Sequence, residues 1–208
     1  MKRGRLFVIS APSGAGKTSL VRALLGQEPE LRLSISHTTR PRRPTESPDV
    51  EYHFVTTAQF EELIRQGAFL EHARVFDNLY GTSRASVERW LQQGKDVVLE
   101  IDWQGAQQVR RAMPEALSVF VLPPSREVLA ERLAQRGTDA PAVIERRLRD
   151  AVSDMAHERE FDYVVVNDDF ATALQDLRRI VSGQGEDLRA GRPQLRPLLQ
   201  RLLGQQPA

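Results

Sequence analysis

Short apolar runs alternate along the chain with segments in which apolar residues recur at helical spacing. The apolar runs predict strands at residues 6–9, 97–102, 118–122 and 161–167. Apolar residues at helical spacing predict helices at residues 19–25, 86–93, 104–113 and 171–181. Strands that alternate with helices are typical of a parallel sheet with helices on both faces. The pattern therefore predicts an α/β fold with a parallel-sheet core.

A different pattern occupies the stretch between the first two of these helices. Alternation of apolar and polar residues at 31–36 and 69–75 is typical of half-buried strands. A further short strand is expected at residues 52–55, and Thr56 or Thr57 is a suitable N-cap for the helix that follows it. Together these segments predict a small mixed sheet with one helix.

Other stretches have a composition that sets them apart. The prolines within residues 37–44 exclude a regular element, so this arginine-rich stretch is predicted to be a loop. Residues 125–160 are helical in pattern and rich in arginine, and a break at 137–141 predicts a helix–loop–helix. Beyond Gly183 the composition shifts to Gln, Gly, Pro and Arg, which predicts a weakly structured tail. Within it, residues 198–203 are suited to dock as one or two amphipathic turns.

Length and charge narrow the class of protein. The chain has 208 residues, with 29 basic and 28 acidic side chains and a net charge of +1. This balance argues against a general nucleic-acid binder. The absence of cysteine excludes disulfides and thiolate metal sites and favours a reducing compartment. Because the sequence shows neither a secretory signal nor a transmembrane run, we expect a cytoplasmic protein without a membrane partner.

The first apolar run leads into a glycine-rich turn made of Ala11, Pro12, Ser13, Gly14, Ala15, Gly16, Lys17 and Thr18. A strand, such a turn and a helix match the phosphate loop of nucleoside triphosphate-binding proteins, although Ala11 replaces the first glycine of the usual pattern. The glycines let N–H groups point at an anion, and the helix presents its positive N-terminus there. Lys17 would reach the β- and γ-phosphates, and the Thr18 hydroxyl would bind Mg²⁺. The motif predicts an ATP-type site and leaves the acceptor open.

Further motifs narrow the acceptor, namely Ser36–Arg43, Tyr52, Glu71, Tyr80–Ser83, Ile101–Gly105 and Val166–Asp169. In this order and spacing they resemble the guanylate kinase family in its bacterial form, across roughly residues 5–180. The resemblance implies a P-loop parallel-sheet core, a small mixed α/β GMP-binding subdomain and a helical lid. It assigns the core to 5–31, 83–124 and 161–183, the subdomain to 32–82, the lid to 125–160 and the tail to 184–208.

The resemblance implies that the phosphate of GMP is bound by Arg40, Arg43 and the hydroxyls of Tyr52 and Tyr80. Forked guanidinium donors suit a dianionic phosphate, and neutral hydroxyls fix its orientation. Without the family, the arginines also fit a solvated basic loop, and the tyrosines fit positions between surface and core. Thr45 and Asp49 replace glycines expected in this loop, which leaves its shape open.

For the guanine base the resemblance points to Ser36, Glu71, Thr82 and Glu100, with Asp102 also in the GMP site. Guanine offers N1–H and N2–H₂ donors side by side, and the Glu71 carboxylate can accept both. Adenine has an acceptor at N1 and no N2 amine, so it would leave that carboxylate unpaired. By pattern alone, Glu71 lies on the solvent face of an alternating strand. Glu100 stands where the family usually carries Asp. Its side chain is one methylene longer, so its carboxylate would meet the guanine base at a different position.

The implied reaction is ATP-dependent phosphorylation of GMP to GDP by in-line transfer with Mg²⁺. In such transfers the protein mainly positions two nucleotides and neutralises the charge on the transferred group. The implied catalytic groups are Lys17, Arg40 and the lid arginines Arg132, Arg136 and Arg147. Mg²⁺ would be held by Thr18 and, through water, by Asp102, which ends a buried strand and so faces the ligand crevice. Asn167 would line the adenine pocket.

The implied role is the supply of GTP and the recycling of GMP, and dGMP is implied as a further acceptor. The resemblance is compatible with a monomer or a homo-oligomer. One alternative is a non-catalytic module of this fold that binds peptides, but such modules have degraded phosphate loops, whereas Gly14, Gly16, Lys17 and Thr18 are intact here. Another is a GTPase, which would need an N-K-x-D motif that the sequence lacks. A kinase of a different small acceptor is the remaining alternative.

Overall fold

The computed structural model of the chain describes residues 2–44, 46–47, 50, 52–75, 77–134 and 141–204, with only the backbone at 141–144. The chain forms two compact units. One consists of Met1–Val8 and Pro29–Leu117, and the other of Ile9–Glu28 and Ser118–Ala208. Among the helices of the described residues, none combines the length and the apolar character that crossing a membrane requires.

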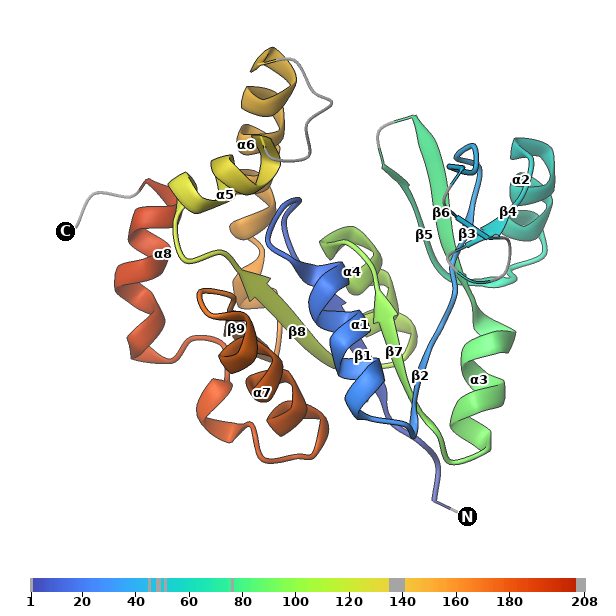
Figure 1. Cartoon of the computed structure of the whole chain (residues 1–208). Coiled ribbons are helices and arrows are strands. Elements are labelled where there is room, and N and C mark those ends of the chain that lie inside the picture. Colours follow the sequence, from blue (N-terminus) through green and yellow to red (C-terminus); the bar gives the residue numbers. More distant parts are fainter. Residues whose placement is uncertain are drawn as a thin grey trace. The chain divides into compact units, whose positions relative to one another are not determined.

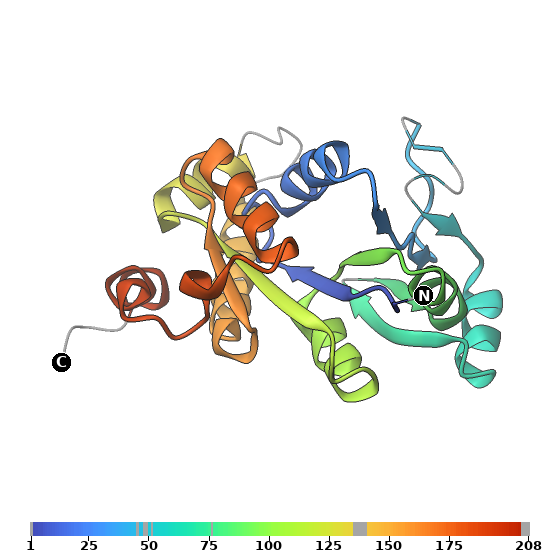
Figure 2. The same ribbon diagram turned by 90° about the horizontal axis from the view of Figure 1, so that it is seen from below.

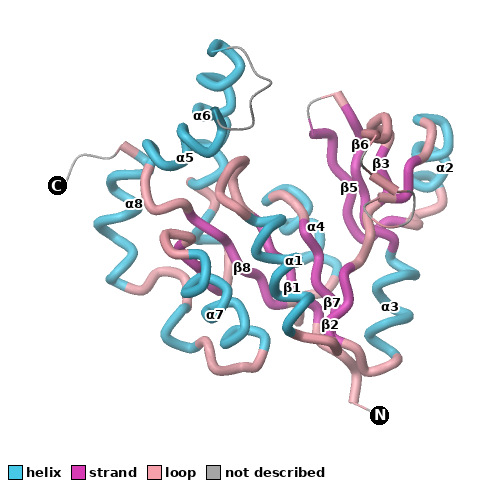
Figure 3. Tube along the Cα trace, in the orientation of Figure 1, coloured by secondary structure: helices cyan, strands magenta, loops and turns pink. Residues whose placement is uncertain are grey.

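A five-stranded sheet has the strand order β2-β7-β1-β8-β9 (Figures 1 and 3). Its strands are β1 (Leu6–Ser10), β2 (Leu31–Leu33), β7 (Asp96–Glu100), β8 (Leu117–Leu122) and β9 (Tyr163–Val166). β2 pairs with β7 in parallel, and so does β8 with β9. Every residue of β1 is buried, as a strand covered on both faces requires. The predicted parallel α/β core is confirmed.

The unit that contains Pro29–Leu117 carries a second, four-stranded sheet in the order β4-β3-β6-β5. Its strands are β3 (His37–Thr38), β4 (His53–Phe54), β5 (Phe69–Val75) and β6 (Asn78–Ser83). β3 and β4 are parallel, whereas β6 is antiparallel to both β3 and β5. The helices of this unit are α2 (Thr57–Arg65), α3 (Arg84–Gln92) and α4 (Trp103–Ala112). The predicted small mixed sheet is therefore present, and Thr56 is confirmed as the N-cap of α2.

Two local predictions for this unit are wrong. His37 and Thr38 form β3, although the proline-rich stretch was predicted to lack a regular element. The prolines begin only at Pro41, and β4 and β6 supply partners on both sides of β3. Residues 31–36 were predicted to join the small sheet, but β2 pairs with β7 in the five-stranded sheet, because alternation along a strand does not specify its partner.

The other unit is built on helices around β8 and β9. α1 (Lys17–Gln27) packs against α7 (Phe170–Val181), and the two helices lie side by side in Figure 1. α5 (Arg126–Ala134) contacts α6 (Pro141–Met155), and the short 3₁₀ helix η1 (Glu158–Glu160) leads back to β9. The two helices of the predicted helix–loop–helix are present, whereas the break at residues 137–140 lies outside the described residues.

The tail is ordered over most of its length, and the prediction of a weakly structured tail is wrong there. It forms η2 (Glu186–Leu188), η3 (Pro193–Leu195) and α8 (Arg196–Leu203), which Figure 2 shows near the C-terminus. Leu188, Leu195 and Leu202 are buried. These widely spaced leucines anchor the segment, and the polar residues between them hid this pattern in the sequence. The predicted docking of an amphipathic turn is confirmed.

Candidate functional site

The phosphate loop joins the end of β1 to the start of α1, where Gly16 is the N-cap residue. Gly14 and Gly16 have φ angles of 89° and 92°, a left-handed conformation that other residues rarely adopt. Gly16 makes no side-chain cap, and the first turn of α1 carries no acidic residue. An anion at this end of α1 would receive backbone N–H groups and the positive end of the helix dipole.

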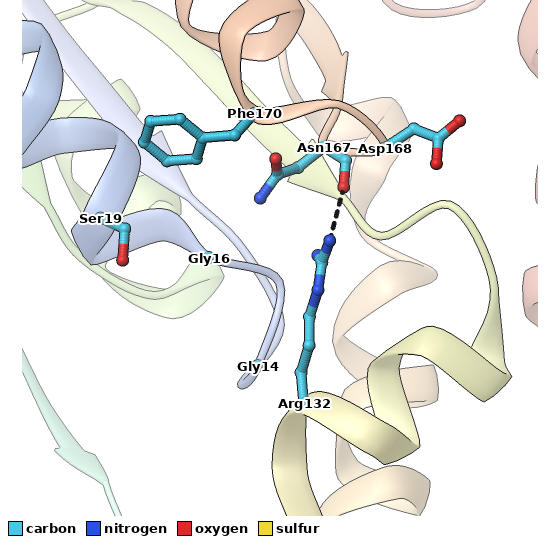
Figure 4. A pocket seen from close by; sticks show the side chains of 7 residues that line it. All are labelled: Gly14, Gly16, Ser19, Arg132, Asn167, Asp168 and Phe170. Atoms are coloured by element: carbon cyan, nitrogen blue, oxygen red, sulfur yellow. Dashed lines mark hydrogen bonds between the residues drawn. The ribbon is translucent and has the colours of Figure 1, made fainter. Parts of the chain in front are cut away.

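Asn167 follows β9 and holds the phosphate loop in place. Its Nδ2 donates to the backbone oxygen of Ala15 at 2.7 Å. A Cβ on Gly16 would lie 2.4 Å from the same Nδ2, so the loop approaches Asn167 too closely for any side chain. On the other side, Nη2 of Arg132 donates to the backbone oxygen of Asn167 at 3.1 Å, as Figure 4 shows. The loop, β9 and α5 are thereby linked.

Two buried polar atoms at this point have no hydrogen-bond partner, Oδ1 of Asn167 and Nη1 of Arg132. Buried polar atoms are normally paired, so such exceptions often mark a place that a ligand completes. One atom is an acceptor and the other is a charged donor. The pair suits a ligand that carries both an amine and anionic oxygens.

A pocket of about 380 Å³ opens beside these atoms, within the size range of small-molecule sites. It is lined by Gly14, Gly16, Ser19, Arg132, Asn167, Asp168 and Phe170 (Figure 4). Sequence reasoning missed Ser19, Asp168 and Phe170. Ser19 directly follows the phosphate-loop motif, and Asp168 and Phe170 follow Asn167 within three residues. Their closeness to these motif residues was the signal that could have identified them. Phe170 is 43% exposed, unusual for a large apolar side chain and suited to contact a flat ring.

The other residues predicted for the ATP side lie in or near this loop. Ala11, Pro12 and Ser13 connect β1 to Gly14, and Lys17 and Thr18 are the first residues of α1. Arg147 lies on α6, and it is not among the described residues that line the pocket. Arg136 lies outside the described residues.

In the other unit, Glu71 is buried, with only 3% of its surface exposed. It lies on β5 opposite Thr82 of β6, whose Oγ1 donates to Oε1 of Glu71 at 2.6 Å. The pairing of the two strands shifts register between Phe69 and Glu71. From Glu71 onward the strand alternates regularly, because Ala73 and Val75 are half-buried on the side of Glu71 whereas His72 and Arg74 are exposed. The structure thus brings Glu71 and Thr82 together.

The first turn of α4 lies against the Glu71 carboxylate. A Cβ on Gly105 would lie 2.7 Å from Oε2 of Glu71, so this close approach requires glycine. Asp102 is the N-cap of α4, and its Oδ1 accepts from the backbone N–H of Gly105 at 2.8 Å. The positive end of α4 favours a carboxylate nearby. Asp102 and Glu71 therefore lie at the same helix end, as two of the residues predicted for the GMP site.

Arg40 is held among aromatic rings and one acidic side chain. Its Nη2 donates to Oε1 of Glu46 at 2.7 Å, and its guanidinium carbon lies 5.5 Å from the centre of the Tyr52 ring. The ring centres of Tyr52 and Tyr80 are 5.9 Å apart. The hydrogen bond that Arg40 donates to Glu46 raises the pKa of Arg40 above its ordinary value. The structure therefore brings Arg40, Tyr52 and Tyr80 together.

Arg43 differs from Arg40, because 69% of its side chain is exposed. Its backbone N–H nevertheless donates to Oε2 of Glu46 at 2.8 Å, so one carboxylate organises both arginines of the loop. Sequence reasoning missed Glu46, which carries no motif of its own. Thr45 and Asp49, whose effect on the loop was left open, lie outside the described residues.

Burial raises the pKa of the Tyr52 hydroxyl, and the nearby charge of Glu100 raises it further. The phenol therefore stays protonated at neutral pH and can donate to an anion. Glu100 is the last residue of β7, half-buried. Ser36 lies just before β3, where its backbone oxygen accepts from the N–H of His53 at 2.9 Å.

Comparison with known proteins gives consistent matches along the chain. A family model described as guanylate kinase matches residues 3–184. The guanylate kinase of Alkalilimnicola ehrlichii is 58% identical over 201 residues, which cover 97% of this chain and 99% of that protein. The guanylate kinase of Methylococcus capsulatus is 56% identical over 204 residues, covering 98% and 100%. A crystal structure of guanylate kinase from Anaplasma phagocytophilum superposes with a TM-score of 0.73 at 32% identity and covers 96% of this chain and 95% of that one.

Proposed function

The chain belongs to the guanylate kinase family, and we propose that it transfers the γ-phosphoryl group of ATP in line to GMP, giving ADP and GDP. The observation that carries the choice of acceptor is the buried Glu71 carboxylate with its Thr82 partner. A carboxylate desolvated in this way gains most from a ligand that offers two adjacent N–H donors, as guanine does. Adenine would leave the Glu71 carboxylate facing a lone pair, which weakens the binding of AMP.

On the donor side, the phosphate loop and α1 bind the β- and γ-phosphates, and Lys17 supplies a positive charge to them. The pocket beside Asn167 takes the adenosine moiety. Oδ1 of Asn167 accepts from the exocyclic amine, and the exposed ring of Phe170 contacts the base. Arg132 directs Nη1 to the phosphates, and with Arg136 and Arg147 it neutralises the transferred group. We assign these three arginines to a lid, residues 125–160, that closes on ATP and excludes water.

On the acceptor side, Arg40 and Arg43 bind the GMP phosphate together with the hydroxyls of Tyr52 and Tyr80. The protonated phenol of Tyr52 donates, and the guanidinium of Arg40 is already oriented by Glu46. Ser36 and Glu100 contribute to guanine binding alongside Glu71 and Thr82. Since dGMP presents the same base and phosphate, it is an acceptor as well.

Mg²⁺ fits the oxygen donors that are present. Thr18 is an exposed residue at the start of α1, and Asp102 supplies a carboxylate at the start of α4. Among the described residues no group of three His, Cys, Asp or Glu side chains forms a protein cage for a metal. A hard ion that keeps its waters and is bound mainly by substrate phosphates suits such a donor set. When bound, it neutralises charge on the β- and γ-phosphates.

The proposed activity places the protein in purine nucleotide metabolism, where GDP formed from GMP supplies GTP. We place the protein in the cytoplasm, where ATP and GMP are both available. The domain division proposed is a core at 5–31, 83–124 and 161–183, a GMP-binding subdomain at 32–82 and the lid at 125–160. Light scattering of the purified protein measures whether it is a monomer or a homo-oligomer.

The proposal is tested by measuring ADP production from ATP with GMP, dGMP, AMP, UMP and CMP, each with Mg²⁺ and with excess EDTA. GMP is expected to be the preferred acceptor, with dGMP next, and EDTA is expected to abolish transfer. Preference for AMP or UMP would refute the assignment. Transfer to GMP that is unchanged by EDTA would refute the role of Mg²⁺.

A further inference from the structure

The C-terminal helix α8 packs onto the unit that contains the phosphate loop. It contacts α6, and Leu202 on its inner face is fully buried. Leu195, directly before it, is also buried. The segment therefore belongs to the folded core of this unit, although it lies far along the chain from the phosphate loop.

The side chain of Arg126 connects α5 to α8. Nε of Arg126, the first residue of α5, donates to the backbone oxygen of Leu202 at 2.6 Å. This oxygen belongs to the last turn of α8, where carbonyl groups have no partner within the helix. Gly204 caps the same turn in a left-handed conformation with φ of 69°, and a Cβ there would lie 2.9 Å from Nη2 of Arg126. The guanidinium thus sits against the C-terminal end of α8, where a positive charge is favoured.

The same short helix α5 contacts the phosphate loop. A Cβ on Gly14 would lie 3.0 Å from Cδ1 of Leu129 and 3.0 Å from Cδ2 of Leu133, so two leucines of α5 support the loop. Arg132 on α5 bonds the backbone oxygen of Asn167. Arg126 and Arg132 are less than two helical turns apart, a distance of about 9 Å along the axis at 1.5 Å per residue. A shift at the first residue of α5 therefore moves Arg132 and both leucines.

We propose that Arg126 is a positioning residue for the ATP site, which it serves by fastening α5 to the C-terminal end of α8. The proposal rests on the proposed function, because it assumes that the pocket beside the phosphate loop binds the phosphoryl donor. Arg126 does not line this pocket, so it acts through α5. It sets the placement of Arg132 and of the leucines beneath Gly14.

Arg126→Met tests the proposal, because methionine keeps an unbranched apolar stem and removes every donor. Its expected effect is a roughly three- to tenfold weaker binding of ADP by calorimetry and a similar rise in KM for ATP, in line with the loss of one charge-assisted hydrogen bond. GMP binding and the KM for GMP are expected to stay unchanged. Arg126→Lys, which keeps the charge and a donor, is expected to recover part of the loss.

Gly204→Ala and Gly191→Ala form a matched pair that separates this role from general stability. Both glycines have a left-handed backbone, with φ of 69° and 77°, so alanine strains both by a similar amount. Only the Gly204 substitution places a methyl group against Arg126, since nothing lies within 4 Å of the corresponding position at Gly191. Gly204→Ala is therefore expected to weaken ADP binding, and Gly191→Ala to leave it unchanged.

The outcomes separate this proposal from the proposed function. If wild-type protein phosphorylates GMP but Arg126→Met binds ADP as wild type does, or loses ADP and GMP binding equally, the positioning role is refuted. Equal effects of Gly204→Ala and Gly191→Ala on ADP binding would refute it as well. If wild-type protein does not phosphorylate GMP, the proposed function fails, while the ADP titrations still report on Arg126.

Discussion

At the residue scale, Glu71 illustrates how much depends on one carboxylate. Alternation along its strand indicates a solvent-facing position, yet the side chain is 3% exposed and bonded to Thr82. It lies on the same side of β5 as the half-buried Ala73 and Val75, opposite to the exposed His72 and Arg74. This buried carboxylate, bonded to Thr82, is the chemical basis of the guanine selection proposed above.

Glu71→Gln is expected to relax discrimination between GMP and AMP. The amide replaces an acceptor by a donor, which suits adenine better and guanine worse. We expect the ratio of kcat/KM for GMP over AMP to fall by about tenfold to a hundredfold, the range of one bidentate base contact. Steady-state kinetics with both acceptors measures it, and an unchanged ratio would remove Glu71 from base selection.

Gly105→Ala is expected to disturb the same carboxylate from the side of α4. The new methyl group would lie 2.7 Å from Oε2 of Glu71, so the side chain or the helix must move. We expect the KM for GMP to rise roughly tenfold, which corresponds to the loss of about one hydrogen bond. Gly26→Ala is the matched control, because it also lies in a helix and nothing is within 4 Å of its added methyl. A similar KM for the two variants would contradict the prediction.

Lys17→Ala is expected to lower kcat by about a hundredfold or more, because the positive charge that we propose for stabilising the transferred phosphoryl group is lost. GMP affinity, measured by calorimetry without ATP, is expected to remain as in wild type. A parallel loss of GMP binding would mean that Lys17 belongs to the acceptor site instead.

At the scale of elements, the arginine loop after β3 is organised by Glu46, which accepts from Arg40 and from the backbone of Arg43. Hydrogen bonding from Arg40 is the main cause that lowers the pKa of Glu46 below its ordinary value of 4.5. A carboxyl group whose pKa is lower in the folded state stabilises the fold above its unfolded pKa. That contribution is lost as pH falls through the folded pKa.

Glu46→Gln is therefore expected to lower the free energy of unfolding by about 1 kcal/mol at pH 7, the scale of a partly buried charged hydrogen bond. The difference from wild type should persist down to about pH 4.5 and shrink below it, as the wild-type carboxyl group also loses its charge. Denaturant titrations between pH 7 and pH 3 measure it. Glu61→Gln, an exposed position on α2, controls for the change in net charge, and an equal effect there would contradict the prediction.

Secondary structure elements were the best predicted level. The parallel core strands, the N-cap of α2 and the strand–loop–helix at the phosphate loop follow from patterns within a few neighbouring residues. The tail formed helical turns that its composition did not predict. The other errors concern strand pairing, because β2 joined a different sheet from the one expected and β3 formed where only a loop was expected. Strand pairing depends on residues far apart in the chain, which a local pattern does not contain.

At the scale of the whole molecule, substrates are expected to stabilise the fold in proportion to their occupancy. GMP at about one hundred times its dissociation constant should add about 2.7 kcal/mol of stability. For a chain of this length that corresponds to a rise in Tm of roughly 5–10 °C. Differential scanning fluorimetry with GMP and, as control, CMP at the same concentration measures it. An equal rise with CMP would mean that the site does not select guanine.

The sequence alone determined the α/β class, the phosphate loop and the family, because each depends on residue types at short, fixed spacing. Tertiary structure alone decided the burial of Glu71, the ordering of the tail and the linkage of Asn167 to the phosphate loop. The hydrogen bond from Asn167 to Ala15 joins positions 152 residues apart, and that from Arg126 to Leu202 joins positions 76 apart. Such contacts form only when distant elements pack together, since their energies come from burial and geometry that no local pattern encodes.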